Sequence, residues 1–463
     1  MIALSLAEIA AITGGRLAGG ADPAAAVASV CIDSRRAVPG ALFFALRGEH
    51  SDGHAYAGQA IEVGAVAAVI SRQVGVPAVV VTDPFAALQQ LARRVRERLT
   101  ARVVAVTGST GKTTTKDLVA GVISRRFRTV AAEGSFNNEL GVPLTVLSAG
   151  ADTQALVLEM GSRGPGQLAE LCGLARPEIG VVTNVGPAHV GLFGSVRAIG
   201  EAKAELVEAL AASGTAILNA DDEMVAEMAG RTRAAVLLFG CRAEAAVRAR
   251  DVRLDAKGCP VFTLIAPNGE AEVALAVPGE HQVSNSLAAA AVGFALGLTV
   301  DEIALGLAAA KGSPMRMEVL QRPDGIRIVN DAYNANPDSM AAALRALAAL
   351  RGEGRAWAVL GEMAELGSAT RNAHEKLGKL VAGLGIDRLV GVGRNAHLTV
   401  GAARRRGMPN DRAVALDTAE EAVAFLAKRL APQDTVLVKA SRVARFERIV
   451  DGLLAGTLTE AVR

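Results

Sequence analysis

The strongest chemical signal in the chain is a glycine-rich run at residues 107–115, which reads TGSTGKTTT. It follows the apolar run 103–106, which predicts a buried strand, and it leads into a helical pattern over 113–126. Such a turn can direct backbone amides, the Lys112 ammonium and a threonine hydroxyl at a polyphosphate. Val106 replaces the first glycine of the strict pattern, and a turn without a ligand is the alternative. We expect nucleoside triphosphate binding, because strand, turn and helix occur together.

Two further side chains follow predicted strands. Glu159 ends the strand expected at 155–159, at the carboxyl edge of a sheet, where it could complete a Mg²⁺ shell begun by Thr113. His189 follows the strand expected at 179–183. Taken singly, Glu159 could equally be a capping or surface carboxylate, and a lone loop histidine is more often a hydrogen-bonding residue than a ligand. The two residues indicate a functional site only when they are considered together with the other motifs.

The elements that must position these residues divide the chain into three expected domains, since 463 residues exceed one ordinary core. Residues 1–100 alternate short strands and helices, which predicts a small α/β domain. Residues 101–312 predict a central parallel sheet of the phosphate-loop ATPase type, with hairpins added between 245 and 277. Residues 313–463 predict a Rossmann-like domain with strands at 326–330, 356–360, 388–392 and 435–439. The expected fold class is α/β.

Composition excludes several classes of protein. With 51% apolar and 21% charged residues the chain is globular, and its longest apolar runs fall short of the ~18 residues of a membrane span. A net charge of +2 offers no basic face for nucleic acid. The four cysteines show no metal-ligand spacing, so free thiols are expected. The N-terminus lacks a basic leader, and Ser5 with Glu8 predicts a helix-capping box. We expect a cytoplasmic monomer.

A set of motifs resembles the Mur ligase family, whose members join an amino acid or a dipeptide to UDP-N-acetylmuramoyl precursors. The run DAYNANPDSM at 331–340 looks like the branch that adds D-alanyl-D-alanine. The resemblance covers essentially the whole chain. The other stretches that carry it are TGSTGKTTTK at 107–116, EMG at 159–161, TNVGPAHVGLFGS at 183–195, EAKAEL at 201–206, and the segments 31–54, 135–147, 279–291 and 359–367.

The resemblance implies an ATP-dependent carboxylate–amine ligase that joins D-alanyl-D-alanine to UDP-N-acetylmuramoyl-tripeptide through an acyl phosphate. It implies ATP and two Mg²⁺ ions as cofactors, and closure of the domains over the site. The third residue of the tripeptide could be meso-diaminopimelate or lysine. Three alternatives stay open: a sister ligase that adds a single amino acid, a folylpolyglutamate synthase-like ligase, and a nucleotide-gated binding protein that has no ligase activity.

Matched position by position, the family's catalytic residues fall on Lys112, Glu159, His189, Lys203 and Arg316. Lys112 would contact the transferring phosphate, and Arg316 would reach the γ-phosphate from the C-terminal domain. Glu159 with Thr113 would hold the first Mg²⁺, and His189 with Lys203 the second. The lysine matching Lys203 is carbamylated in several members, which requires the neutral amine that burial favours.

The remaining carried-over positions concern nucleotide and acceptor. Asn285 and Asn334 would approach the adenine, and Asp331 the ribose. The phosphates would meet Gly108, Ser109, Thr110, Gly111, Lys112, Thr113 and Thr114. Asp33, Ser34 and Arg35 would help form the UDP site, with Asn137 and Asn138 nearer the muramoyl peptide. Without the family argument, a turn at 33–35 and a loop at 137–138 are plausible alternatives.

The chain departs from the family's pattern at two positions. Many relatives have a glutamate where this chain has Gly191, so position 191 offers no helper carboxylate beside His189. Many have a glycine where this chain has Ala440, which would allow a close backbone approach near the incoming dipeptide. Neither departure touches the phosphate loop or the metal ligands, so we expect activity to be retained.

Overall fold

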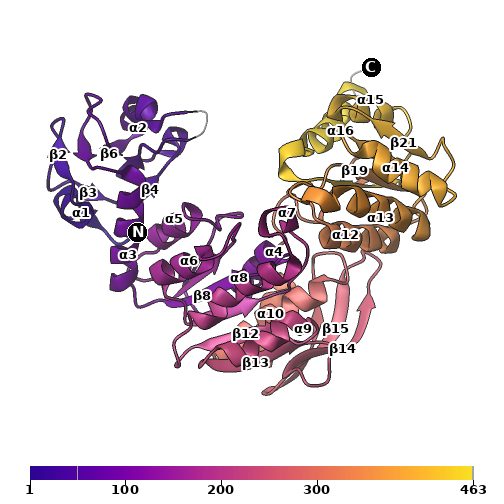
Figure 1. Ribbon diagram of the computed structural model, residues 1–463, viewed down its shortest axis with the longest axis horizontal. Helices are drawn as coiled ribbons and strands as arrows, with labels where there is room; N and C mark the ends of the chain where they lie inside the picture. Colours follow the sequence, from indigo (N-terminus) through magenta and orange to yellow (C-terminus); the bar gives the residue numbers. More distant parts are fainter. Residues whose placement is uncertain (49–50, 461–463) are drawn as a thin grey trace.

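Three large β-sheets organise the chain, each built from its own stretch of sequence (Figure 1). The computed structural model describes residues 1–48 and 51–460. Glu49 and His50, inside the 31–54 motif, and residues 461–463 of the expected last domain lie outside the described residues. The N-terminal and C-terminal parts stand on opposite sides of the central part in Figure 1. The α/β fold class is confirmed.

The N-terminal part is a five-stranded sheet in the order β2-β7-β6-β5-β4, with a small pair β1–β3 beside it. The predicted capping box at Ser5 is confirmed, because Ser5 Oγ accepts from the Glu8 amide and Glu8 accepts from the Ser5 amide. The strands are β1 Leu4–Ser5, β2 Arg16–Ala18, β3 Ala26–Val27, β4 Ser29–Cys31, β5 Ala41–Phe44, β6 Ala65–Ile70 and β7 Ala78–Val80, and the helices are α1 Leu6–Thr13, α2 Ala57–Val63 and α3 Pro84–Arg98.

The central part is a nine-stranded sheet in the order β16-β15-β14-β13-β12-β11-β8-β10-β9. It is parallel from β9 to β14, and β14, β15 and β16 pair antiparallel, as the expected hairpins require. The strands are β8 Arg102–Thr107, β9 Thr129–Ala131, β10 Ala155–Glu159, β11 Ile179–Val182, β12 Thr215–Asn219, β13 Ala235–Gly240, β14 Val247–Leu254, β15 Pro260–Ala266 and β16 Gly269–Ala274. The helices are α4 Lys112–Ile123, α5 Gly141–Ser148, α6 Gln167–Ala175, α7 Val190–Phe193, α8 Val196–Glu208, α9 Glu223–Ala226, α10 Gln282–Ala295 and α11 Val300–Ala309.

The C-terminal part is a six-stranded sheet in the order β17-β18-β22-β19-β20-β21, parallel except for the edge strand β17. This arrangement agrees with the expected Rossmann-like pattern. The strands are β17 Glu318–Gln321, β18 Arg327–Asn330, β19 Ala356–Leu360, β20 Arg388–Val392, β21 Ala413–Leu416 and β22 Thr435–Lys439. The helices are α12 Pro337–Leu350, α13 Thr370–Gly383, α14 Ala396–Arg405, α15 Ala419–Ala427 and α16 Glu447–Glu460.

The apolar cores do not follow the sheets one to one. One cluster of buried side chains joins the N-terminal part to the central part, where Leu91 and Val95 of α3 belong to the same cluster as Val146 of α5 and Leu168 of α6. The C-terminal part has two clusters on the two faces of its sheet, and Val277 of the central part belongs to one of them. The boundaries expected near 100 and 312 stay a prediction. In the described part of the chain, no helix is long and apolar enough to cross a bilayer, and the four cysteines are free.

His374 on α13 is a buried histidine whose titration makes the fold sensitive to pH. Its Nε2 accepts from the Met363 amide at 3.3 Å, and its Nδ1 lies 3.1 Å from Thr399 Oγ1. Burial lowers the pKa of His374 to about 4, below the value near 6.5 of an unfolded histidine. Between these two values the unfolded chain binds a proton that the folded chain does not. Stability is therefore present above pH ~6.5 and is lost as the pH falls through this window.

We expect this effect to appear in calorimetric Tm values measured from pH 7 to pH 4. In His374→Gln, which cannot titrate, the Tm should fall less steeply than in the unmodified protein. Parallel Tm profiles for the two proteins would contradict the assignment.

Candidate functional site

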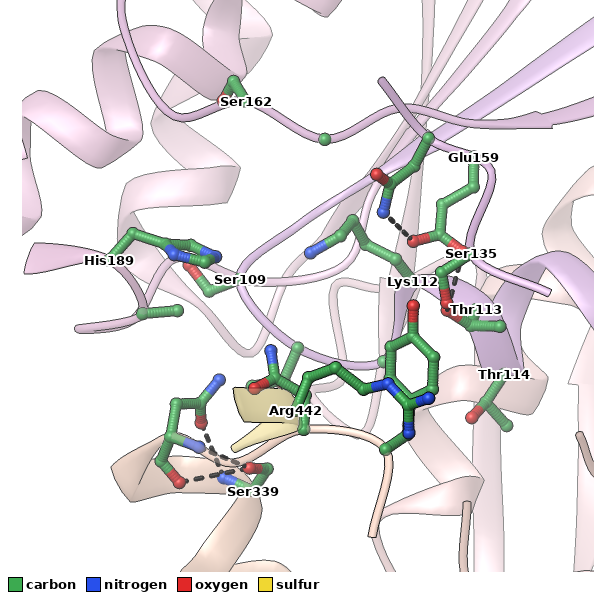
Figure 2. A pocket seen from close by; sticks show the side chains of 18 of the residues that line it. Ser109, Lys112, Thr113, Thr114, Ser135, Glu159, Ser162, His189, Ser339 and Arg442 are labelled. Atoms are coloured by element: carbon green, nitrogen blue, oxygen red, sulfur yellow. Dashed lines mark hydrogen bonds between the residues drawn. The ribbon is translucent and has the colours of Figure 1, made fainter. Parts of the chain in front are cut away.

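A cleft of about 790 Å³ lies between the central and C-terminal parts. Its walls bring together every predicted catalytic and metal-binding residue: Lys112, Thr113, Glu159, His189, Lys203 and Arg316. They also include the other predicted nucleotide residues except Gly108, and both Asn137 and Asn138. Asp33, Ser34 and Arg35 do not line this cleft. Figure 2 shows Lys112 extending between His189 and Glu159.

The glycine-rich turn joins β8 to α4, and the helix begins at Lys112, one residue earlier than expected. Gly111 has a φ of 77°, a left-handed conformation that suits glycine at this helix N-cap. A side chain at Gly108 would collide with Thr183 Oγ1, so this glycine permits close packing of the turn rather than lining the cleft. Both glycines meet both requirements, because Gly108 also has a positive φ of 151° and a Cβ built at Gly111 would collide with Asn285 Oδ1.

Residues 183–186 support the phosphate loop through hydrogen bonds. These contacts were not predicted from the sequence. The Thr110 amide donates to Asn184 Oδ1 at 2.8 Å, and Thr183 Oγ1 donates to the Thr110 carbonyl at 2.7 Å. The Ser109 amide donates to the Asn184 carbonyl at 2.9 Å. These contacts arise because β11 pairs directly with β8 in the sheet. The available signal was the TN pair that immediately follows the β11 strand.

Replacing Asn184 by leucine should loosen the loop. Two side-chain hydrogen bonds to Thr110 would be lost, and at about 1 kcal/mol each the Kd for Mg·ADP should rise roughly thirtyfold. Isothermal titration calorimetry measures this directly, with the exposed Asn410→Leu as the matched control. An unchanged Kd in a variant that unfolds at the usual temperature would show that Asn184 does not shape the loop.

Lys112 lies deep in the cleft, where its Nζ donates to the Gly108 carbonyl at 2.7 Å. Burial lowers the pKa of Lys112, and the nearby Arg316 lowers it further, while Glu159 opposes the shift. Within the described part of the chain, the Lys112 ammonium donates to a carbonyl rather than pairing with a carboxylate. An anionic ligand in the cleft would supply the missing negative charge.

Glu159 is the carboxylate best placed to hold a cation. It is 1% exposed, and its Oε2 accepts from Thr113 Oγ1 at 2.6 Å. Its Oε1 accepts from Asn137 Nδ2 at 2.7 Å, so Asn137 orients this carboxylate in addition to lining the cleft. Hard oxygen donors of this kind fit Mg²⁺. Among the described residues there is no cluster of three or more His, Cys, Asp or Glu side chains, so further ligands would be hydroxyls, phosphates or water.

Lys203 and His189 form the opposite wall. Lys203 is 5% exposed, and burial together with Lys112 places its pKa well below the ordinary value. The buried lysines with ion pairs in the described part of the chain are Lys116 and Lys439, so a salt bridge does not explain Lys203. Burial likewise lowers the pKa of His189, which favours the neutral imidazole, the form that can bind a metal ion. An amine beside Lys112 does not fit a metal ion, whereas a carbamate oxygen would.

A carboxylate does lie beside His189, although position 191 cannot supply one. His189 Nδ1 is hydrogen-bonded to Glu365, which comes from the loop after β19 in the C-terminal part. The backbones also meet, since the Gly191 amide donates to the Glu365 carbonyl at 2.9 Å. Glu365 belongs to the motif at 359–367, but no role was predicted for it.

The C-terminal wall presents Arg316, whose Nη2 donates to Ser135 Oγ at 2.9 Å and whose guanidinium lies 4.3 Å from the Tyr333 ring centre. Asp331 pairs with Lys439 at 2.5 Å and also accepts from the Met317 amide at 3.1 Å. Both of its carboxylate oxygens are therefore engaged. A ribose hydroxyl would have to share them.

The expected asparagines have local partners as well. Asn285 Nδ2 donates to Gln282 Oε1 at 2.8 Å, and its Oδ1 accepts from Thr115 Oγ1 at 3.3 Å, beside the phosphate loop. Asn334 Oδ1 accepts from the Ala335 amide at 2.9 Å. Asn138 Oδ1 accepts from the Gly141 amide at 3.0 Å at the start of α5. Asn285 and Asn334 line the cleft, but their amides are partly committed.

The predicted UDP residues lie in the N-terminal part and contact one another. Asp33 accepts from the Arg35 amide at 3.0 Å and pairs with the Arg35 guanidinium at 2.7 Å, which holds the pKa of Asp33 to about 2. Ser34 Oγ donates to Gln59 Oε1 at 2.7 Å. This is the turn geometry that the sequence allowed as an alternative, and its assignment to UDP remains a prediction.

The second departure, Ala440, does not disturb the cleft. Its methyl group is fully buried in the core of the C-terminal part, against Gly361, where a Cβ built on that glycine would lie 2.7 Å from Ala440 Cβ. Its neighbours Lys439 and Ser441 line the cleft, and Ala440 does not. The methyl group therefore points into the core rather than into the cleft.

The chain matches known families over most of its length. Residues 26–102 match the Mur ligase family catalytic domain, 106–293 the Mur ligase middle domain, and 315–442 the Mur ligase glutamate ligase domain. A UDP-N-acetylmuramoyl-tripeptide–D-alanyl-D-alanine ligase of Mycobacterium tuberculosis is 42% identical over an alignment of 509 positions that covers 100% of both chains.

Solved structures are similar as well. The crystal structure of MurF from Acinetobacter baumannii has a TM-score of 0.85 at 31% identity, covering 98% of this chain and 99% of that chain. The MurF ligase of Thermotoga maritima, crystallised in complex with ADP, has a TM-score of 0.78 at 30% identity and covers 93% of this chain and 98% of its own.

Proposed function

The chain belongs to the Mur ligase family, and from this premise we infer that it uses ATP to join D-alanyl-D-alanine to UDP-N-acetylmuramoyl-tripeptide. The product is the UDP-N-acetylmuramoyl-pentapeptide of peptidoglycan synthesis. The observation that carries the inference is the meeting of Lys112, Glu159 and Arg316 in one cleft, on a chain matched from end to end by tripeptide ligases. These full-length matches do not favour a single-amino-acid ligase or a folylpolyglutamate synthase.

The reaction needs an activated acid, because a carboxylate does not condense with an amine at a useful rate in water. A carboxylate oxygen of the tripeptide attacks the γ-phosphorus of ATP, and ADP leaves. The dipeptide amine then attacks the acyl carbon, the C–O bond to phosphate breaks, and the amine loses a proton. Lys112 and Arg316 face the cleft from its two walls, where they would stabilise the transferring phosphoryl charge.

We propose that Thr113 and Glu159 hold one Mg²⁺ and that His189 and a carbamylated Lys203 hold a second. When bound, Mg²⁺ neutralises charge on the transferring phosphoryl group. The lowered pKa of Lys203 supports carbamylation, since only the neutral amine reacts with CO₂. Asn137 would keep the Glu159 carboxylate oriented through its hydrogen bond.

The other roles follow the cleft geometry. We propose that Asn285, Asn334 and Asp331 contact the nucleoside, and that Asp33, Ser34 and Arg35 contact the UDP group from the N-terminal part. ATP and nucleotide-linked precursors are cytoplasmic metabolites, so we expect the enzyme to work there. We expect a monomer.

The decisive test is phosphate release with ATP, Mg²⁺, UDP-N-acetylmuramoyl-tripeptide and D-alanyl-D-alanine, with each component left out in turn. We expect release only with the complete mixture and a pentapeptide product by mass spectrometry. Turnover with a single amino acid instead of the dipeptide would indicate a sister ligase. ATP hydrolysis that is independent of both organic substrates would indicate a nucleotide-gated protein.

A further inference from the structure

Glu365 meets His189 across the boundary between the C-terminal and central parts. Its carboxylate is hydrogen-bonded to His189 Nδ1. A carboxylate can only accept, so Nδ1 carries the proton and donates it to this bond. The lone pair of a neutral imidazole is then on Nε2, which is the atom left to bind a metal ion.

The loop that carries Glu365 is anchored by hydrogen bonds within the C-terminal part. The Met363 amide donates to the buried His374, and the Ala364 amide donates to Ser441 Oγ at 2.9 Å. Glu365 itself has a φ of 60°, a left-handed conformation that a non-glycine residue adopts only when its surroundings hold it. Arg163 of the central part lies 4.0 Å from the other carboxylate oxygen. The carboxylate is therefore held in place rather than free on the surface.

Gly191 explains how the two loops come so close. A Cβ built there would lie 2.7 Å from the Glu365 carbonyl oxygen and 2.7 Å from the Gly367 amide nitrogen. Gly191 does not have a positive φ, so its backbone would accept alanine and only the lack of space forbids it. The absence of a side chain at 191 thus has a structural reason in this chain. The backbone of the loop that carries Glu365 occupies the space that a side chain at position 191 would need.

We propose that Glu365 is a positioning residue that fixes the ring orientation and tautomer of His189 for the second metal site, an assignment that rests on the proposed function. Carboxylates commonly orient ligating histidines in this way. Here the carboxylate belongs to a different part of the molecule from the ligand. The His189 ligand is therefore completed only when the C-terminal part docks on the central part.

The first test compares Glu365→Ala and Glu365→Gln with the unmodified enzyme in phosphate release at varied Mg²⁺. In Glu365→Ala we expect the Mg²⁺ concentration for half-maximal rate to rise about 10- to 100-fold, with the KM for the dipeptide unchanged. Glu365→Gln keeps an acceptor for Nδ1 and should recover part of the loss. Unchanged Mg²⁺ dependence in Glu365→Ala would overturn the proposal.

A second pair of variants tests the docking itself. Gly191→Ala keeps the carboxylate but should push the loops apart, and we expect it to reproduce the Mg²⁺ dependence of Glu365→Ala. Gly173→Ala in α6 is the matched control, because a Cβ there meets nothing within 4 Å. Normal Mg²⁺ dependence in Gly191→Ala would show that the close approach is not required.

A third measurement does not depend on ligation. With ¹⁵N-labelled histidine, the signal of His189, assigned among six histidines by His189→Gln, should report the Nδ1–H tautomer in the unmodified protein and a mixture in Glu365→Ala. If the unmodified protein did not ligate but showed this difference, the proposed function would fail while the Glu365 contact stood. If it ligated and Glu365→Ala left the tautomer unchanged, the positioning role would fail alone.

Discussion

Lys112→Met is expected to abolish measurable ligation, with kcat lowered by about 10³-fold or more. Methionine keeps most of the length of the side chain and removes the only charge that the phosphate loop itself presents to the cleft. Phosphate release with saturating substrates measures the effect. Lys257→Ala, which removes an exposed lysine from a hairpin turn, is the matched control and should retain full activity.

The same variant makes an unusual prediction for stability. Because burial lowers the pKa of Lys112, the folded protein without ligand holds this ammonium at a cost. The Tm of Lys112→Met without nucleotide should therefore equal or exceed that of the unmodified chain, while the rise in Tm on adding Mg·ATP should shrink. A large fall in the Tm of the unliganded variant would mean that Lys112 supports the fold. The loss of activity would then no longer be evidence for a catalytic role.

The second large effect concerns Lys203. Lys203→Ala should lose about 10³-fold in kcat, because the carbamate that we propose as a metal ligand cannot form. A small carboxylate such as formate should restore part of this activity by occupying the space left by the side chain. It should not restore Lys112→Met, which lacks a cation rather than an anion.

Removal of CO₂ separates this explanation from simple packing. The unmodified enzyme should lose rate in CO₂-free buffer and regain it with bicarbonate, and ¹³CO₂ should give a protein-bound carbamate signal that Lys203→Ala lacks. Full activity without CO₂, together with no such signal, would show that the buried lysine acts as an amine.

The sequence predicted best what depends on neighbours in the chain. The phosphate loop, the Glu159 strand end and the alternation of strands and helices are local patterns, and the structure contains each within a few residues. Asn184 was missed because its partner Thr110 is 74 residues away, and the contact exists only because β11 lies beside β8. Glu365 lies 176 residues from His189. No pattern along the chain relates them.

Side-chain direction was equally hidden from the sequence. The alanine at position 440 was expected to affect a close backbone approach near the incoming dipeptide, and its methyl group lies against Gly361 in the core. Asn137 was expected near the muramoyl peptide, and in the structure it also donates to Glu159. In both cases the partners of the side chain depend on packing between segments that are remote in sequence.

The apolar cluster shared by the N-terminal and central parts bears on the modularity of the chain. A fragment ending near residue 100 would expose the apolar face of α3 that packs with α5 and α6, whereas the buried residues described in the two C-terminal clusters lie beyond residue 312 except Val277. We therefore expect the N-terminal and central parts to fold as one unit and the C-terminal part to fold more independently. Exchange of whole segments between relatives should be tolerated at the linker near residue 312 and penalised near residue 100.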